Sequence, residues 1–174
     1  MDKSQIITHS SAPLSHTAYD VKWVPQTARF ALLGQKPAGS GVLTVYGLSE
    51  GALEIKATIE KPHSFKCGTF GASSASNFAV GDFSGRLSMF DLASKSQDPI
   101  WSTSAHSEII NCIDGVAGKS NKCGPPELAT GSRDGAIKIW DVRQPQSAVA
   151  TMAPKEGDPK IDAWAVAFGT ATSK

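Results

Sequence analysis

The chain is poor in cysteine and has no long hydrophobic run. It contains 3 cysteines in 174 residues, Cys67, Cys112 and Cys123, and none belongs to a Cys-x-x-Cys pair. An odd number of cysteines without zinc-ligand spacing argues against a disulfide framework and a zinc site, and favours reduced thiols in a cytoplasmic protein. The longest all-apolar run, Ala163–Phe168, is too short to span a membrane, and the first residues lack the apolar core of a signal peptide.

Neither sign of charge is in excess. The sequence has 17 Lys+Arg against 16 Asp+Glu, a net charge of +1. A nucleic-acid-binding surface needs an excess of cations to neutralise phosphates, and an acidic disordered chain needs a large negative charge. We therefore expect neither nucleic acid nor membrane as a partner. A hydrophobic content of 40% is sufficient for a folded core.

The sequence also lacks the common catalytic motifs. It contains no Gly-x-Ser-x-Gly, no His-Glu-x-x-His and no phosphate-binding P-loop. The glycine-rich string 34–41 includes Lys36, but it precedes a strand pattern instead of opening a helix, which indicates an inter-strand loop. The four histidines are spread along the chain and do not have the spacing of a metal cluster. We expect a protein that is not an enzyme and needs no cofactor or metal.

What the chain does contain is a regular alternation of breakers and short apolar runs. Its 16 glycines and 10 prolines divide it into short segments, and the longest segment free of both, 100–114, shows no helical periodicity. Runs with alternating apolar residues, rich in β-branched and aromatic types, follow glycine-containing turns at 42–46, 87–90 and 136–140. This is the signature of β-hairpins, so the sequence predicts an all-β fold.

The strand-like runs recur at a nearly constant interval. The aromatic residues that end them are separated by 44 and 50 residues: Tyr46, Phe90 and Trp140. A second series ends shorter stretches, at gaps of 47, 44 and 54 residues: Trp23, Phe70, Asp114 and Phe168. Periods of about 40–45 residues with four strands each are typical of propeller blades, and loop insertions explain the longer gaps.

We therefore expect one domain, 1–174, that is part of a β-propeller. Its repeat units are placed at approximately 14–50, 61–95 and 104–143, and the first strand of a fourth unit in 161–174. Such an arrangement is an incomplete ring, because propellers need about four to eight blades to protect their sheet edges. The sequence thus indicates part of a longer propeller, with a self-associating half-propeller as the alternative.

The third unit has the pattern of a WD repeat. Residues 128–141 read Leu-Ala-Thr-Gly-Ser-Arg-Asp-Gly-Ala-Ile-Lys-Ile-Trp-Asp. In WD repeats a His, a Ser or Thr, an Asp and a Trp of one blade form a hydrogen-bonded chain, and by resemblance these are His106, Thr130, Asp134 and Trp140. The residue types suit such a chain, because the carboxylate can orient the imidazole and the hydroxyl can accept the indole N–H.

The other two units resemble this pattern less closely. In the second unit Val80, Ser84 and Phe90 stand at the positions of the threonine, the aspartate and the tryptophan, and only His63 remains. The first unit likewise retains its histidine, His16. We expect the second blade to be held together by packing instead of a polar network.

Several further strings are more specific than the repeat itself: Gln-Ile-Ile at 5–7, Asp-Val-Lys-Trp-Val-Pro at 20–25, Lys-Cys-Gly-Thr-Phe-Gly-Ala at 66–72, Glu-Ile-Ile-Asn-Cys-Ile-Asp-Gly at 108–115, Thr-Gly-Ser-Arg-Asp-Gly at 130–135 and Trp-Ala-Val-Ala-Phe-Gly at 164–169. In these strings the chain resembles the Monad family of WD-repeat proteins, from about Gln5 to Gly169. The resemblance implies a seven-bladed propeller in the cytoplasm. It also implies a prefoldin-like co-chaperone complex with its AAA+ ATPases as partners, dynein subunits as clients, and a role in preassembly of axonemal dynein arms.

A short string at the end of the third unit suggests an alternative function. Residues Trp140–Arg143 read Trp-Asp-Val-Arg and resemble the motif by which certain WD-repeat proteins dock on a cullin–RING ubiquitin ligase adaptor. Arg143 would offer its planar guanidinium to the adaptor. However, Trp-Asp belongs to the repeat itself, and the corresponding string at 90–93 lacks the arginine. The alternative is a substrate receptor of such a ligase.

The residues expected to contact partner proteins lie in the turn after the second strand or the loop before the first strand of a unit: Lys61, His63, Phe83, Glu108 and Arg133. An aromatic residue in a turn that needs none is a candidate anchor, although Phe83 could equally be buried against the neighbouring blade. Arg133 could equally pair with a neighbouring acid. The sequence as a whole predicts a non-catalytic scaffold for protein–protein interaction.

Overall fold

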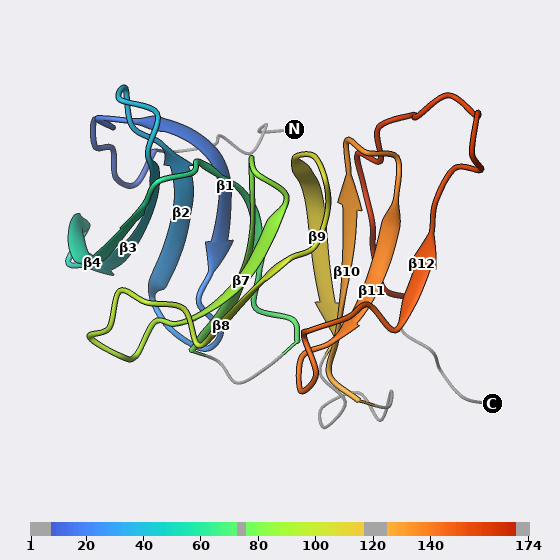
Figure 1. The fold of residues 1–174 in the computed structure, drawn as a ribbon. Coiled ribbons are helices and arrows are strands. Elements are labelled where there is room, and N and C mark those ends of the chain that lie inside the picture. Colours follow the sequence, from blue (N-terminus) through green and yellow to red (C-terminus); the bar gives the residue numbers. More distant parts are fainter. Residues whose placement is uncertain (1–7, 73–75, 117–124, 170–174) are drawn as a thin grey trace, which may run out of the picture.

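The computed structural model describes residues 8–72, 76–116 and 125–169. These residues form an all-β fold of three four-stranded antiparallel sheets, which follow one another in chain order (Figure 1). The prediction of an all-β protein is therefore confirmed. Within the described ranges, no helix is long and apolar enough to cross a membrane.

Each sheet is built from four consecutive strands. The first sheet contains β1 (Thr17–Trp23), β2 (Arg29–Gln35), β3 (Gly41–Ser49) and β4 (Ala52–Lys61). The second contains β5 (Phe65–Thr69), β6 (Asn77–Asp82), β7 (Arg86–Asp91) and β8 (Trp101–Ser104). The third contains β9 (Ile110–Val116), β10 (Glu127–Ser132), β11 (Ile137–Asp141) and β12 (Ala150–Met152). Each sheet extends past the end of its predicted unit (50, 95 and 143), because the fourth strand follows there.

Glycine makes two of the hairpins possible. Gly85 and Gly135 occupy the turns between the second and third strands of the second and third sheets, with φ values of 79° and 82°. L-residues with a side chain rarely adopt these angles. The strands on either side of Gly85, β6 and β7, are largely buried, and β3 is buried at seven consecutive residues. A strand that is buried on both faces has a nearly continuous run of apolar residues, whereas in a half-exposed strand apolar and polar residues alternate.

Two hydrophobic cores lie between neighbouring sheets. The first joins the first and second sheets: Ala31, Leu33, Leu43, Val45, Ile59, Phe65, Phe78, Val80 and Phe90. The second joins the second and third sheets: Cys67, Ala72, Ala79, Leu87, Met89, Ala105, Ile110, Ile113, Leu128 and Trp140. The first strands lie nearest one another, with β1 contacting β5 and β5 contacting β9. Each sheet therefore depends on its neighbour for burial.

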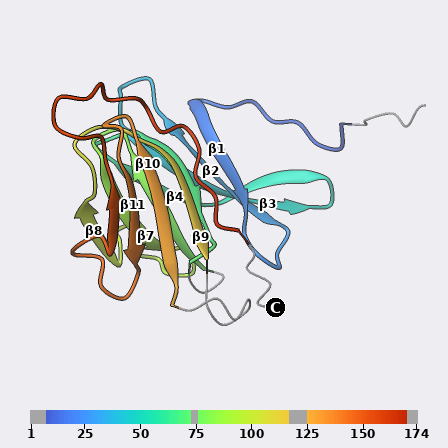
Figure 2. The ribbon, with the colours of Figure 1, turned by 90° about the vertical axis from the view of Figure 1, so that its right-hand side faces the viewer.

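Residues 161–169, at the start of the predicted fourth unit, are not part of these sheets. The chain after β12 passes over the third sheet and descends beside β9 (Figure 2). The amide N–H of Ala163 donates to the carbonyl of Ser132 (3.0 Å) and that of Phe168 to Asp114 Oδ2 (2.7 Å). The predicted strand in this segment is not formed among the described residues, because the one backbone–backbone bond, from Ala163 to Ser132, does not make a ladder.

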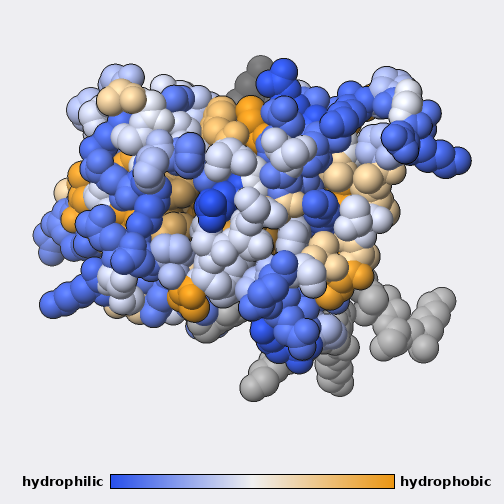
Figure 3. Space-filling model, in the orientation of Figure 1, coloured by the Kyte–Doolittle hydropathy of each residue, from blue (hydrophilic) through white to orange (hydrophobic). Residues whose placement is uncertain are grey.

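Hydrophobic side chains are exposed on both flanks of the three sheets. On the side of β1, Val21 and Trp23 are 55% and 61% exposed, and on the other side Met152 and Trp164 are 56% and 68% exposed. In the space-filling view, patches of hydrophobic residues interrupt a largely hydrophilic surface (Figure 3). Among the described residues the three sheets do not close into a ring.

The described cysteines are free thiols. Cys67 is buried and Cys112 half-buried, and burial raises the pKa of both thiols. Both groups are therefore protonated and unreactive at neutral pH. Cys123 lies outside the described residues, as does the string at 5–7.

Candidate functional site

Every first strand carries an irregularity at the same place. The register shifts between Ala18 and Asp20 in β1, between Phe65 and Cys67 in β5, and opposite Gly131 in β9. The skipped residues are Tyr19, Lys66 and Asn111. A β-bulge re-aims the side chain of its extra residue, and bulges are common beside functional sites.

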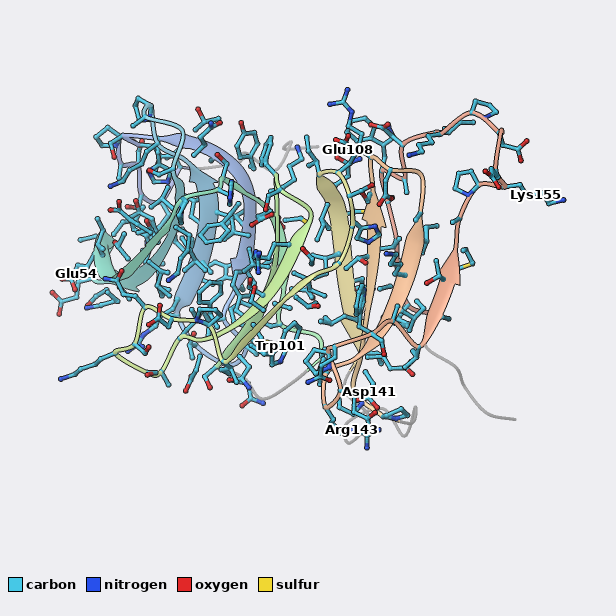
Figure 4. All side chains as sticks on the ribbon, in the orientation of Figure 1. Glu54, Trp101, Glu108, Asp141, Arg143 and Lys155 are labelled. Atoms are coloured by element: carbon cyan, nitrogen blue, oxygen red, sulfur yellow. The ribbon has the colours of Figure 1, made fainter. Side chains whose placement is uncertain are left out.

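These bulges lie near the end of the sheets at which the first strands begin, here called the upper face. Glu108 marks this end in Figure 4, and Arg143 lies at the opposite end. The turns after the second strands reach the same face, because the N–H of Phe83 donates to the carbonyl of Ser64 and the N–H of Arg133 to that of Ile109, both at 3.0 Å. Turn residues and bulge residues are thereby brought together.

Phe83 lies against aromatic and cationic groups of the inner strands. Its ring centroid is 5.1 Å from that of Tyr19, which belongs to the neighbouring sheet. The ammonium of Lys66 lies 4.9 Å from the centroid of Tyr19 and 5.9 Å from that of Phe83. Such contacts are cation–π interactions, and they fix the position of the Lys66 side chain. Phe83 is half-buried, so it contributes both to packing and to the surface.

A hollow of about 320 Å³ opens beside this cluster, here called the upper hollow. Its walls include the following side chains: Lys66, Phe83, Asn111, Arg133, Asp162 and Trp164. The hollow thus combines two cations, one carboxylate, one amide and two aromatic rings. Neither cation forms a hydrogen bond or an ion pair with another described residue, although Lys66 makes the two ring contacts.

The remaining residues predicted to contact partners lie elsewhere. His63 and Glu108 are exposed in the loops before β5 and β9 and do not line the upper hollow. Lys61 points toward the loop between β7 and β8, where its ammonium pairs with Asp98 at 3.0 Å. The structure therefore brings Phe83 and Arg133 into one hollow, with His63 and Glu108 in the loops nearby, and directs the ammonium of Lys61 away from it.

Arg143 is engaged within the chain at the opposite end (Figure 4). Its Nε donates to Asp141 Oδ1 at 2.9 Å, and its terminal NH₂ donates to the other carboxylate oxygen. The hydrogen bond from Arg143 lowers the pKa of Asp141 to about 2. One edge of the guanidinium that would have to contact a ligase adaptor is thus engaged by a neighbouring carboxylate.

A polar network crosses the interior of the third sheet. His106 Nδ1 lies 3.1 Å from Asp134 Oδ2, and His106 Nε2 lies 2.8 Å from Thr130 Oγ1. The indole N–H of Trp140 donates to the same hydroxyl at 2.9 Å. Because the carboxylate accepts from Nδ1, the Thr130 hydroxyl donates to Nε2 and accepts from the indole. The network joins the loop before β9, the β10–β11 turn and two strands.

The network fixes the charges of its ionisable members. Burial lowers the pKa of His106 below its ordinary 6.5, against the attraction of Asp134, and the cation of Lys138 lowers it further. For Asp134, burial acts to raise the pKa, but the N–H groups of Ala136 and Ser107 together with His106 hold it below its ordinary 3.8. The native network therefore pairs a neutral imidazole with a carboxylate.

We expect the protein to lose stability as the pH falls below about 6.5. The unfolded chain binds a proton at His106 there while the folded network resists it, so the contribution of His106 is present above the ordinary pKa and is lost below it. Melting temperatures measured between about pH 7.5 and about pH 5 check this. His106→Gln should show a smaller loss over this interval; an equal loss would assign the effect to other groups.

The second sheet uses a different polar device. Asp82, buried at the end of β6, accepts hydrogen bonds at Oδ1 from the Ser84 N–H (2.8 Å), the Ser84 hydroxyl (2.7 Å) and the Arg86 N–H (2.9 Å). Aspartate favours such turns because its side chain replaces a backbone acceptor. The turn that carries Phe83 is therefore rigid, although the sheet lacks the WD-type network.

Four residues at this site were not predicted from the sequence: Lys66, Asn111 and Trp164, which line the upper hollow, and Tyr19, which lies against Phe83 and Lys66 beside it. Three of them stand at the bulges, and Trp164 stands four residues before Phe168, as Lys66 does before Phe70. The period of the second aromatic series could have located these positions. Their orientation could not be deduced from it, since a bulge changes which way a side chain points.

Comparison with known proteins relates the chain to one group of relatives. It is 47% identical over 173 residues to a protein of Xenopus tropicalis, 44% over 172 residues to one of Homo sapiens, and 44% over 170 residues to one of Chlamydomonas reinhardtii. All three are named dynein axonemal assembly factor 10. The alignments cover 97–98% of this chain but 47–48% of the relatives. The chain thus spans about half the length of the curated relatives it matches. No protein-family profile matches it.

The fold has a counterpart among solved structures. A chain in the crystal structure of the mitotic checkpoint complex superimposes with a TM-score of 0.63 at 19% sequence identity, over 81% of this chain and 40% of that one. At this identity the likeness concerns the fold alone. It confirms the prediction of a WD-repeat β-propeller arrangement with an unclosed ring.

Proposed function

We infer that this chain belongs to a non-catalytic WD-repeat scaffold that acts in the cytoplasmic preassembly of axonemal dynein arms. The observation that carries the proposal is the identity of 44–47% to dynein axonemal assembly factors from vertebrates and a green alga, over nearly the whole chain. Its partners are a prefoldin-like co-chaperone complex and dynein subunits, as the resemblance to the Monad family implies. The scaffold works by holding several proteins on one rigid framework.

The upper face is the proposed contact surface. It is the end of the sheets to which the bulges and the β6–β7 and β10–β11 turns contribute, and it presents Phe83, Arg133 and Trp164 together. Aromatic residues and arginine are the types that most often dominate binding energy in protein interfaces. The rigidity of the turns favours binding, because little conformational freedom is lost when a partner docks.

We do not extend the proposal to docking on a ubiquitin ligase adaptor. To offer its Nε edge to the adaptor, Arg143 would have to exchange its carboxylate partner, Asp141, for a group on the adaptor. An exchange of one charged partner for another gains little free energy at an exposed site.

Arg133→Ala and Arg143→Ala provide a matched pair for testing this function. Both remove an exposed guanidinium, one at the upper face and one at the opposite end. With tagged protein expressed in a ciliated cell, Arg133→Ala should lower the co-purified dynein heavy chain by about tenfold or more. Quantitative mass spectrometry of the tagged complexes measures the ratio.

The control, Arg143→Ala, should leave the co-purified dynein unchanged. The proposal is wrong if no dynein subunit co-purifies with the unmodified protein. A loss caused by Arg143→Ala, with no effect of the upper-face variant, would place the working surface at the opposite end. Circular dichroism of the purified variants establishes that the fold is retained.

A further inference from the structure

One residue of the upper hollow, Asn111, has a side-chain hydrogen-bond donor without an acceptor in the described structure. Asn111 stands at the bulge of β9, and its Nδ2 is buried without a hydrogen-bond partner in the described structure. A buried amide N–H₂ without an acceptor costs free energy comparable to a lost hydrogen bond. Asn111 is one of the residues that line the open hollow, so a turn of its side chain can bring the amide to an acceptor supplied from outside.

Two cations without a carboxylate partner stand in the same wall. Lys66 and Arg133 form no ion pair among the described residues. The donors of Lys66, Arg133 and Asn111 together match the lone pairs of one carboxylate. Their convergence in a hollow of about 320 Å³ limits the ligand to one or two side chains.

The aromatic rings beside the hollow do not form a receptor for a cation. The ammonium of Lys66 already lies over the rings of Tyr19 and Phe83, at 4.9 and 5.9 Å from their centroids. A methylated lysine or another cation would have to displace it. The exposed faces of Phe83 and Trp164 remain available for apolar groups on either side of an acidic one.

Asp162 is the one charge in the wall that opposes an acidic ligand. It forms no hydrogen bond or ion pair with Lys66 or Arg133 in the described structure. The charges of the wall therefore sum to +1, two cations less one carboxylate. Glu108 lies in the loop before β9 and does not line the hollow, so it weakens the attraction only at longer range.

We propose that the upper hollow binds an acidic side chain of a partner protein, a glutamate or aspartate flanked by apolar residues in an extended segment. The carboxylate accepts from Lys66, Arg133 and Asn111, and the flanking residues contact Phe83 and Trp164. The inference rests on the proposed function only in taking the ligand to be a protein segment. Charge complementarity selects the acidic residue, and the two rings select its neighbours.

Four peptide libraries test this. Each consists of fluorescent peptides of roughly ten residues with identical randomised flanks, and they differ only in one fixed central residue: glutamate, glutamine, lysine or phosphoserine. Binding to the purified protein is measured by fluorescence anisotropy at low and high salt. The glutamate library should bind about tenfold more tightly than the glutamine library, and the difference should shrink in high salt.

Variants separate the site from general effects. Lys66→Met keeps the apolar stem against the two rings and removes the charge, and it should weaken glutamate binding about tenfold. Lys95→Met, the same change at an exposed loop residue between β7 and β8, should have no effect. Asp162→Asn removes the opposing charge and should strengthen binding about threefold. Since misfolding does not improve binding, this gain is specific to the proposed site.

Several outcomes would overturn the proposal: no binding of the glutamate library at millimolar concentration, equal binding of glutamine, tighter binding of lysine, or a preference above tenfold for phosphoserine. The last would assign the hollow to a phosphorylated segment. A different result would contradict only the proposed function: the unmodified protein co-purifies no dynein subunit but still binds the glutamate library more tightly than the glutamine library. The inference about the upper hollow would then stand.

Discussion

Replacing Trp140 with alanine is expected to destabilise the protein by about 3–5 kcal/mol, the range for removing a large buried aromatic side chain. The indole is 3% exposed and belongs to the core between the second and third sheets. Its N–H also donates to Thr130 Oγ1 at 2.9 Å, so alanine leaves a cavity and removes one of the hydrogen bonds of the Thr130 hydroxyl. Chemical denaturation of the purified protein, followed by fluorescence of the remaining tryptophans and by circular dichroism, measures the difference.

A second substitution separates the two contributions. Trp140→Phe retains most of the apolar volume and removes the N–H donor, so it should cost about 1–3 kcal/mol. Phe90 occupies the corresponding position in the second sheet, where it is 1% exposed and packs edge-on against Phe65. If the alanine and phenylalanine variants were equally stable, the hydrogen bond would outweigh the packing, contrary to this expectation.

Adding a single methyl group at Gly71 is expected to be nearly as damaging. A Cβ atom on Gly71 would lie 2.0 Å from the carbonyl oxygen of Gly115, a backbone atom of the neighbouring strand β9. Because backbone atoms cannot rotate away, the second and third sheets would have to separate. Gly71→Ala should therefore destabilise the protein by about 3 kcal/mol, at the upper end of the range for overpacking.

The control for this substitution is Gly169→Ala. A Cβ atom on Gly169 meets nothing within 4 Å, and its φ is not in the left-handed region. The free energy of unfolding of the Gly169→Ala variant should stay within about 0.5 kcal/mol of that of the unmodified protein. Denaturation midpoints of the two variants, measured side by side, check the contrast. A Gly71→Ala variant as stable as Gly169→Ala would mean that the inner segments yield easily.

The repeat period was the part of the fold that could be read from sequence. Tyr46, Phe90 and Trp140 all lie in third strands, so their spacing of 44 and 50 residues measures the blade. The alternation of apolar and polar residues does not locate the ends of the strands, because β3 is buried on both faces and its apolar residues are nearly continuous. The fourth strands are less apolar still: β12 is exposed at all three residues, so nothing in its pattern marks it as part of a sheet.

The upper hollow could be predicted only in part. Phe83 and Arg133 attract attention because each stands in a tight turn, a position that the sequence makes visible. Lys66 and Asn111 are not visible in this way, because they lie within strands. The alternation of side chains along a regular strand would assign each to one face of the sheet, but the bulge changes that direction. The ion pair between Asp98 and Lys61 could not be predicted from the sequence, since the two residues are 37 positions apart.

The sequence by itself determined the kind of fold, the repeat, the residues of the polar network and the resemblance to one family. Each of these depends on residue type and spacing along the chain, which are local properties. Tertiary structure decided which side chains meet: Lys66 over Tyr19 and Phe83, and an unsatisfied Asn111 beside Arg133. Those contacts depend on the bulges and on the packing of one sheet against the next. A shift of one residue in strand register turns a side chain to the other face of its sheet.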